Sequence, residues 1–180
     1  MKRSFKKLMV VMVGLLVSLS LIVSIGQAGD MTKDLAIQYI LATAKAARTV
    51  YVKGVIGRAQ AGGVNPDEDW VKQDHAIMLP AQFVKAVGAE IKDFELTLIG
   101  TNPLYGANAA KTPKEKEMLE KLASGKEKIL TFEDGGRHIG FSADFAIVQG
   151  CADCHNKHPK TTKKDWKKGD FMGAIAVRMR

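Results

Sequence analysis

The run Cys151-Ala152-Asp153-Cys154-His155, close to the C-terminus, constrains this chain more than any other feature of its sequence. C-x-x-C-H is the attachment motif of a c-type haem, in which both thiols form thioethers to the porphyrin and the histidine ligates the iron. The motif predicts one covalent haem c per chain, held by Cys151, Cys154 and His155. Most cytochromes c are all-helical and carry the motif near the N-terminus, so we do not expect the ordinary cytochrome c fold.

Three other uses of these residues remain open. Cys151, Cys154, His155 and His158 could form a Cys2His2 zinc site, although zinc folds usually take two ligand pairs from separated segments. A thioredoxin-like dithiol is the second alternative, because the apolar run 139–148 could be the strand that leads into the cysteines. The alternation of strands and helices that such a fold needs is weak here. A plain structural disulfide is the third.

The first 28 residues have the pattern of a secretory signal peptide. Four cations lie among the first seven residues, an apolar run extends from Leu8 to Ile25, and Gly26-Gln27-Ala28 offers small residues before a cleavage site. We expect residues 29–180 to form a single haem c-binding domain in the periplasm, outside the inner membrane, where bacterial haem attachment takes place. The apolar run approaches the ~20 residues that span a bilayer, so an uncleaved membrane anchor is the alternative.

The charge distribution argues against a nucleic-acid partner. Four of the eight net positive charges lie in the first seven residues, and no acid precedes Asp30, so only half of the excess belongs to the domain itself. The other basic cluster follows the haem motif, and only Asp165 interrupts it. Its members are Lys157, Lys160, Lys163, Lys164, Lys167 and Lys168. Such a run is either a solvated loop or an electropositive rim for an acidic redox partner.

The spacing of apolar residues predicts an α+β fold with an antiparallel sheet. We expect a long amphipathic helix over 32–60, a short helix over 81–91 that Pro80 opens, and a charged helix over 114–123 after Thr112-Pro113. Strands are predicted over 94–99, 128–132, 138–148 and 171–177, with the middle two joined as a hairpin at 134–136.

The end of the chain resembles the haem c-containing PAS-like sensor domain, a family that occurs alone behind a signal peptide or as the extracytoplasmic input of histidine kinases. The haem motif is followed by a lysine-rich loop, by Trp166-Lys167-Lys168-Gly169-Asp170 and by Gly173-Ala174, and 79–83 and 101–103 add weaker matches. The resemblance implies a PAS-like antiparallel sheet with helices on one side and haem c held against the sheet. Some family members use a cysteine as second axial ligand, and this chain has no third cysteine.

The sixth iron ligand is therefore not fixed by the resemblance. His75, in the loop before Pro80 and next to Asp74, is our first candidate, and Met78 and His138 are weaker ones. His158 is too close to His155 to reach the opposite face of the ring. A site with no protein ligand at the sixth position is also open. The three possibilities differ in their consequences: two histidines would give a low potential, histidine and methionine would raise it, and an open face would permit binding of a small gas.

These features predict an exported monohaem c-type cytochrome that acts as a redox- or gas-sensing module. A small periplasmic electron-transfer cytochrome is the alternative, and a haem-free dithiol oxidoreductase is the third choice. We do not expect an enzyme, because a peroxidase would need a distal acid or base and only His75 could supply one. The sequence does not identify a redox or signalling partner. A homodimer that forms through the 32–60 helix is possible.

Overall fold

The computed structural model describes residues 31–180, and the signal peptide predicted for residues 1–28 lies outside them. Residues Lys33–Arg180 form one compact unit. Between residues 31 and 180, none of the helices combines the length and the apolar character that a membrane span requires.

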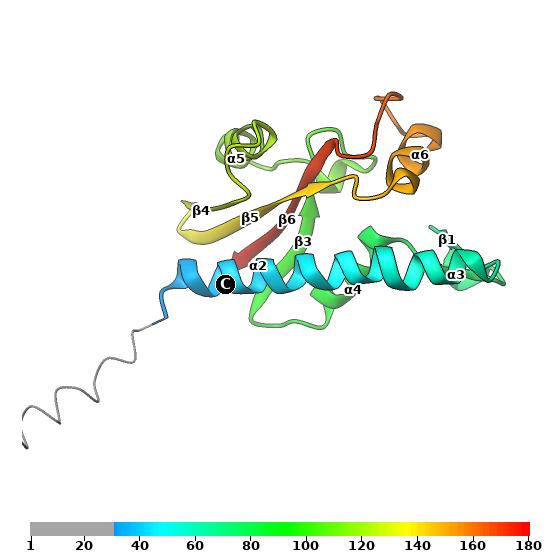
Figure 1. Cartoon of the computed structure of the whole chain (residues 1–180). Coiled ribbons are helices and arrows are strands. Elements are labelled where there is room, and N and C mark those ends of the chain that lie inside the picture. The colour runs from blue at the N-terminus through cyan, green and yellow to red at the C-terminus, as the bar shows by residue number, and fades with distance from the viewer. Residues whose placement is uncertain (1–30) are drawn as a thin grey trace, which may run out of the picture. The chain divides into compact units, whose positions relative to one another are not determined.

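Four strands form an antiparallel sheet in the order β3-β6-β5-β4 (Figure 1). Their bounds are β3 Phe94–Ile99, β4 Ile129–Asp134, β5 Arg137–Phe145 and β6 Phe171–Met179. The predicted hairpin joins β4 to β5, and Gly135 and Gly136 at its turn have φ values of 57° and 75°. A type I′ turn needs positive φ at both central positions, which glycine adopts without steric cost. The predicted α+β fold with an antiparallel sheet is confirmed.

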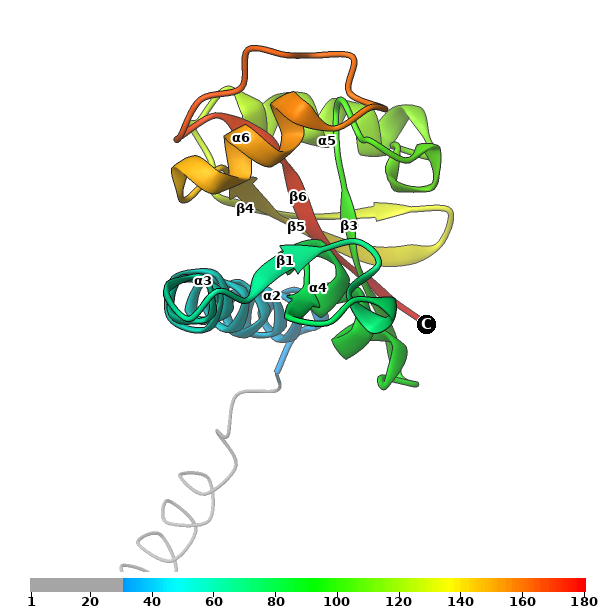
Figure 2. The same ribbon diagram turned by 90° about the vertical axis from the view of Figure 1, so that its right-hand side faces the viewer.

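Helices cover both faces of this sheet. The first segment is α2 Lys33–Val50, and α4 Pro80–Ala89 lies beside it on the same face. The other face is covered by α5 Pro113–Ala123 (Figure 1 and Figure 2). Because both faces of the central strand β6 are covered, its middle residues are buried without a polar alternation. The arrangement differs from the one implied by the resemblance, which had helices on one side only.

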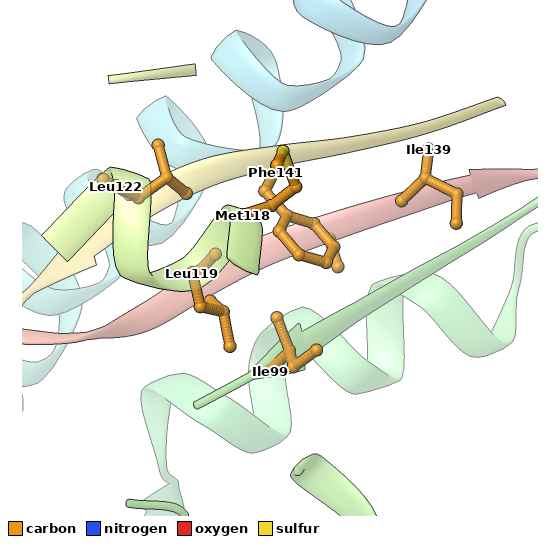
Figure 3. Packing of buried hydrophobic residues seen from close by; sticks show 9 residues of the cluster. Ile99, Met118, Leu119, Leu122, Ile139 and Phe141 are labelled. Atoms are coloured by element: carbon orange, nitrogen blue, oxygen red, sulfur yellow. The ribbon is translucent and has the colours of Figure 1, made fainter. Parts of the chain in front are cut away.

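The two apolar clusters follow from strand periodicity. Residues 174 and 176 of β6 point towards α5, while residues 175 and 177 point towards α2 and α4. The α5 cluster contains Met118, Leu119 and Leu122 from the helix, packed on Ile99, Ile139 and Phe141 from the strands (Figure 3). The α2 cluster contains Ile37, Leu41, Val84, Leu96, Ile175 and Val177. The sheet is thus the shared wall of two cores.

The predicted long helix is confirmed, but part of its second half is a π-helix, which is wider than an α-helix. After α2 the chain forms a π-helical segment η1 Tyr51–Ile56 and then α3 Gly57–Ala61. The Tyr51 ring stacks on Phe83 of α4, with ring centroids 4.5 Å apart, and its hydroxyl donates to the Met78 carbonyl at 2.7 Å. A π-helical turn often occurs beside a functional site. The sequence analysis did not foresee it.

The remaining elements are short. β1 Asn65–Asp67 and β2 Ala76–Met78 pair in parallel, which the sequence did not indicate. Two 3-10 turns, η2 Trp70–Lys72 and η3 Gly106–Asn108, lie in the connecting loops. The haem motif lies on a further helix, α6 Gln149–Lys157.

Candidate functional site

The two cysteines and the histidine of the C-x-x-C-H motif lie on α6 and all face one cavity. The cavity has a volume of about 930 Å³, within the range of roughly 300–1,000 Å³ that is usual for small-molecule and cofactor sites. Residues three and four apart share one face of a helix, so Cys151 stands beside Cys154 and His155 on the cavity side. Both thiols are free. The three predicted attachment residues are therefore brought together at one site.

The cavity lies at the end of the sheet where β3 and β5 stop and β6 begins. Its apolar wall includes Val52 and Ile56, which are buried residues of the π-helical segment, and Leu98 and Ile99 from the end of β3. The helix α4 and the loop 102–105 also contribute residues. Segments distant in sequence thus enclose the face of α6 that carries the motif.

The imidazole of His155 is held in a neutral state that suits metal ligation. Burial, reinforced by His158 and Arg48, lowers the pKa of His155 below its ordinary value. Its Nδ1 is buried and has no hydrogen-bond partner, which leaves Nε2 as the nitrogen that can reach a ligand. A neutral imidazole nitrogen is the form that binds a metal ion.

Asn156 positions Trp166, and the Trp166 ring packs against His155. The Asn156 amide nitrogen donates to the Trp166 carbonyl at 2.9 Å, and the Trp166 N–H donates to the Asn156 side-chain oxygen at 2.8 Å. These two bonds bring the buried Trp166 ring edge-on to the His155 ring, with centroids 5.9 Å apart. The tryptophan of the Trp166–Asp170 motif is therefore a packing residue for the predicted iron ligand.

The rest of that motif fastens the lysine-rich loop to the sheet. The Lys167 N–H donates to the Asp170 carboxylate at 2.9 Å, and Gly169 turns the chain with a φ of 94°. The N–H of Gly169 donates to the Ala146 carbonyl and the N–H of Ala146 donates to the Asp170 carbonyl, both at 2.9 Å. Both ends of the segment that carries α6 are thus tied together, just after β5 and just before β6.

A buried ion pair lies in the wall of the same cavity. Arg48 of α2 contacts Asp144 at the end of β5, with a guanidinium nitrogen 2.9 Å from a carboxylate oxygen. Both residues line the cavity, and the Nε of Arg48 is buried without a hydrogen-bond partner. Burial raises the pKa of Asp144, and the positive charges of Arg48 and Lys45 oppose that shift. Sequence reasoning could not identify this pair, because its members are far apart in the chain.

A polar cluster joins three loops at the edge of the cavity. His158 Nε2 lies 3.2 Å from a Glu68 carboxylate oxygen, and the Tyr105 hydroxyl donates to the other oxygen at 2.7 Å. His158 Nδ1 accepts a hydrogen bond from the Lys160 N–H at 3.1 Å, and the Lys160 ammonium lies 4.0 Å from the centre of the Tyr105 ring. Both ring nitrogens of His158 therefore already have partners.

The structure does not bring the predicted sixth ligands to this site. His75 is exposed in a turn with a φ of 57° and does not line the cavity. Met78 does not line it either. His138 lies in the β4–β5 hairpin, where its Nε2 is 2.9 Å from Glu133. Met172, at the start of β6, does line the cavity, and the sequence analysis missed it.

The zinc alternative has no support in residues 31–180. No group of three or more histidine, cysteine, aspartate or glutamate side chains in this part of the chain is arranged to hold a metal ion. His158, the fourth residue of the alternative Cys2His2 set, contacts Glu68 through its Nε2 at 3.2 Å.

Comparison with known proteins gives one finding. The sequence profile of the family described as Tll0287-like (Tll0287) matches residues 31–180. No curated protein and no solved structure matches the chain.

Proposed function

Because the chain belongs to the Tll0287-like family, we propose that it is an exported monohaem c-type cytochrome that acts as a sensing module for redox state or a small gas. One observation carries the proposal: the C-x-x-C-H motif lies on a helix whose cysteines and histidine line a cavity of about 930 Å³. Attachment motif, neutral imidazole and cofactor-sized space coincide at one place.

The residues at the site fit a haem c. Cys151 and Cys154 are free, stand on one face of α6 and would form the two thioether bonds. His155, with its buried Nδ1 and lowered pKa, would ligate the iron through Nε2. A bound haem c supplies one-electron chemistry and an iron whose second axial position can be protein-ligated or open. The apolar wall of Val52, Ile56 and neighbouring residues would shield the ring from water.

The dithiol oxidoreductase is the haem-free alternative for the same two cysteines. A reactive C-x-x-C thiol has a lowered pKa, because the thiolate is the nucleophile. Here partial burial and then the carboxylate of Glu68 raise the pKa of Cys154 above its ordinary value. This environment favours the protonated thiol at the second cysteine of the motif, which is not the attacking residue of a C-x-x-C pair, so the shift is compatible with both functions.

Electron transfer is the second candidate function, and the surface beside α6 favours it. Lys157, Lys164, Lys167 and Lys168 are exposed around the helix that carries the motif. Lys163, in contrast, contacts Asp165 and Asp170, and its ammonium lies 4.8 Å from the centre of the Trp166 ring. A positive surface next to the redox centre would dock an acidic partner.

The test is covalent haem in the exported protein. The full chain is expressed with the haem-ligation machinery, and the denatured protein is stained for haem on a gel. Wild type should retain haem through denaturation, whereas the Cys151→Ala, Cys154→Ala double variant should retain none. A wild-type chain that carries no covalent haem under these conditions refutes the proposal, and the haem-free dithiol oxidoreductase then becomes the favoured function.

The same preparation separates the two candidate roles. Spectra of the oxidised and reduced protein are recorded with and without carbon monoxide. A spectrum that shifts with carbon monoxide supports gas sensing, because the iron then has an open or displaceable position. A spectrum that does not shift supports redox sensing or electron transfer. Salt-sensitive reduction by an acidic partner protein, lost when Lys157, Lys164, Lys167 and Lys168 become glutamines, would favour the electron carrier.

A further inference from the structure

The start of β6 contains a β-bulge, and the bulge places Met172. Along the β5–β6 pair, Asp144 lies opposite Gly173, but the next residue of β5, Phe145, lies opposite Phe171. Met172 has no partner in the register. The extra residue of a bulge leaves the strand ladder, and its side chain is redirected. Met172 is a half-buried residue that lines the cavity.

The packing of the neighbouring residues confirms that Met172 is the inserted one. In a regular strand, residues three apart point to opposite faces of the sheet. Ala174 and Phe171, however, both pack into the α5 cluster. The Phe171 ring also meets the Phe145 ring edge-on, with centroids 5.8 Å apart. One extra residue between 171 and 174 is what allows both to lie on the same face.

Gly173 fixes the bulge in place. Its φ is 145°, and a Cβ at this position would lie 2.1 Å from the Ile99 carbonyl oxygen and 2.7 Å from the Gly100 Cα. Here β6 approaches the end of β3 more closely than any side chain would permit. The backbone at Gly173 is therefore held, and the direction of the preceding Met172 is held with it.

Two other cavity-lining side chains that could ligate iron are engaged elsewhere. Both ring nitrogens of His158 have partners, and the Tyr105 hydroxyl donates to Glu68. Among the methionines of residues 31–180, Met172 alone lines the cavity. The chain offers no third cysteine.

We propose that Met172 is the sixth ligand of the haem iron, with its thioether sulfur completing the coordination that His155 begins. The inference rests on the proposed haem c function and deepens it. A neutral, soft thioether favours the reduced iron, so histidine and methionine ligation gives a higher potential than two histidines would. The iron is then six-coordinate and low-spin, and the module responds to redox state.

The ligand lies on the central strand. β6 pairs with both β3 and β5 and contributes to both apolar clusters. A change in the iron–sulfur bond would therefore act on an inner strand that both apolar clusters share. In an electron carrier, by contrast, a ligand on a surface loop would serve equally well.

The test uses the haem-loaded full chain and three variants. Met172→Leu keeps the volume but removes the sulfur, Met172→His replaces the sulfur with an imidazole, and Met78→Leu is the matched control at a methionine that does not line the cavity. Spin state, carbon monoxide binding and reduction potential are measured. We expect a low-spin wild type, a high-spin Met172→Leu that binds carbon monoxide, a Met172→His of lower potential, and a Met78→Leu that matches wild type.

Two results would overturn the inference while leaving the haem function intact. One is covalent haem in Met172→Leu with a spectrum identical to that of wild type. The other is a wild-type iron that is already high-spin. If wild type holds no covalent haem on a denaturing gel, the proposed function itself fails, and the ligand assignment fails with it. Covalent haem in Met172→His shows that this site still folds, so a spectral change there reports ligation.

Discussion

Replacing Asn156 with alanine removes the link between α6 and the Trp166 segment. The Asn156 side chain makes two hydrogen bonds to the Trp166 backbone, of 2.9 Å and 2.8 Å, and both are partly buried. No other side-chain bond described for residues 31–180 joins these two positions. The Trp166 ring, which is 5 % exposed, packs against His155. The variant therefore tests how the predicted iron ligand is supported.

The expected loss follows from these contacts. Two hydrogen bonds of about 1 kcal/mol each account for about 2 kcal/mol. Weakening the Trp166–His155 ring contact adds up to about 1 kcal/mol, and the higher helix propensity of alanine offsets about 0.6 kcal/mol. The free energy of unfolding should fall by about 2 kcal/mol, which in a domain of this size corresponds to a decrease in Tm of about 4–8 °C.

Urea unfolding of the purified protein measures this loss. Gln149→Ala is the matched control, because Gln149 lies on the same helix and makes one exposed hydrogen bond to Asp153 at 2.8 Å. That change should stay within about 0.5 kcal/mol. In the haem-loaded protein, Asn156→Ala should also change the reduction potential while retaining covalent haem, since the Trp166 ring would no longer be held against His155. An Asn156→Ala protein as stable as Gln149→Ala would refute the supporting role.

Two further predictions concern stability. Gly173→Ala should lower the free energy of unfolding by about 1–3 kcal/mol, because the new Cβ meets the Ile99 carbonyl; Gly150→Ala in α6 has open space and should raise it by about 0.4–1 kcal/mol. If urea unfolding showed that the free energy of unfolding changes in the same direction in Gly173→Ala and Gly150→Ala, this reasoning would be contradicted. The pKa of His155 is lowered in the folded state, so the folded protein binds fewer protons than the unfolded chain, and haem-free protein should lose stability as the pH falls below 6.5. The urea midpoint of His155→Gln should depend less on pH over this range, and an equal dependence would count against the buried imidazole.

The local patterns of the sequence predicted most of the sheet and helices. The strand over 94–99 was predicted with the bounds that the structure has, and Thr112 caps α5 by accepting from the Glu115 N–H at 3.1 Å. These features depend on residues close together in the chain. The π-helical segment 51–56 and the three-residue β1–β2 pair were missed, because each is too short to be recognised from its apolar periodicity.

The candidate site divides in the same way. The attachment residues were predictable because the motif is contiguous, and α6 presents all of them to one cavity. The Arg48–Asp144 pair in the cavity wall was not predictable, since it joins residues from two elements that are distant in the sequence. His75 was favoured by its neighbours in sequence, whereas ligation depends on proximity in space, and the turn at His75 leaves it exposed.

The position of Met172 shows which sequence signal was available and overlooked. The run 171–177 was interpreted as a regular strand, in which Met172 would point away from Phe171 and Gly173. A glycine inside an apolar strand, however, often marks a bulge or a close approach of another backbone. Gly173 marks both, because the register shifts beside it and the Ile99 carbonyl occupies the space of a Cβ. The placement of Met172 therefore depends on a single glycine, and our proposal that Met172 ligates the haem iron predicts that Gly173→Ala changes the spin state of the haem-loaded protein as well as its stability.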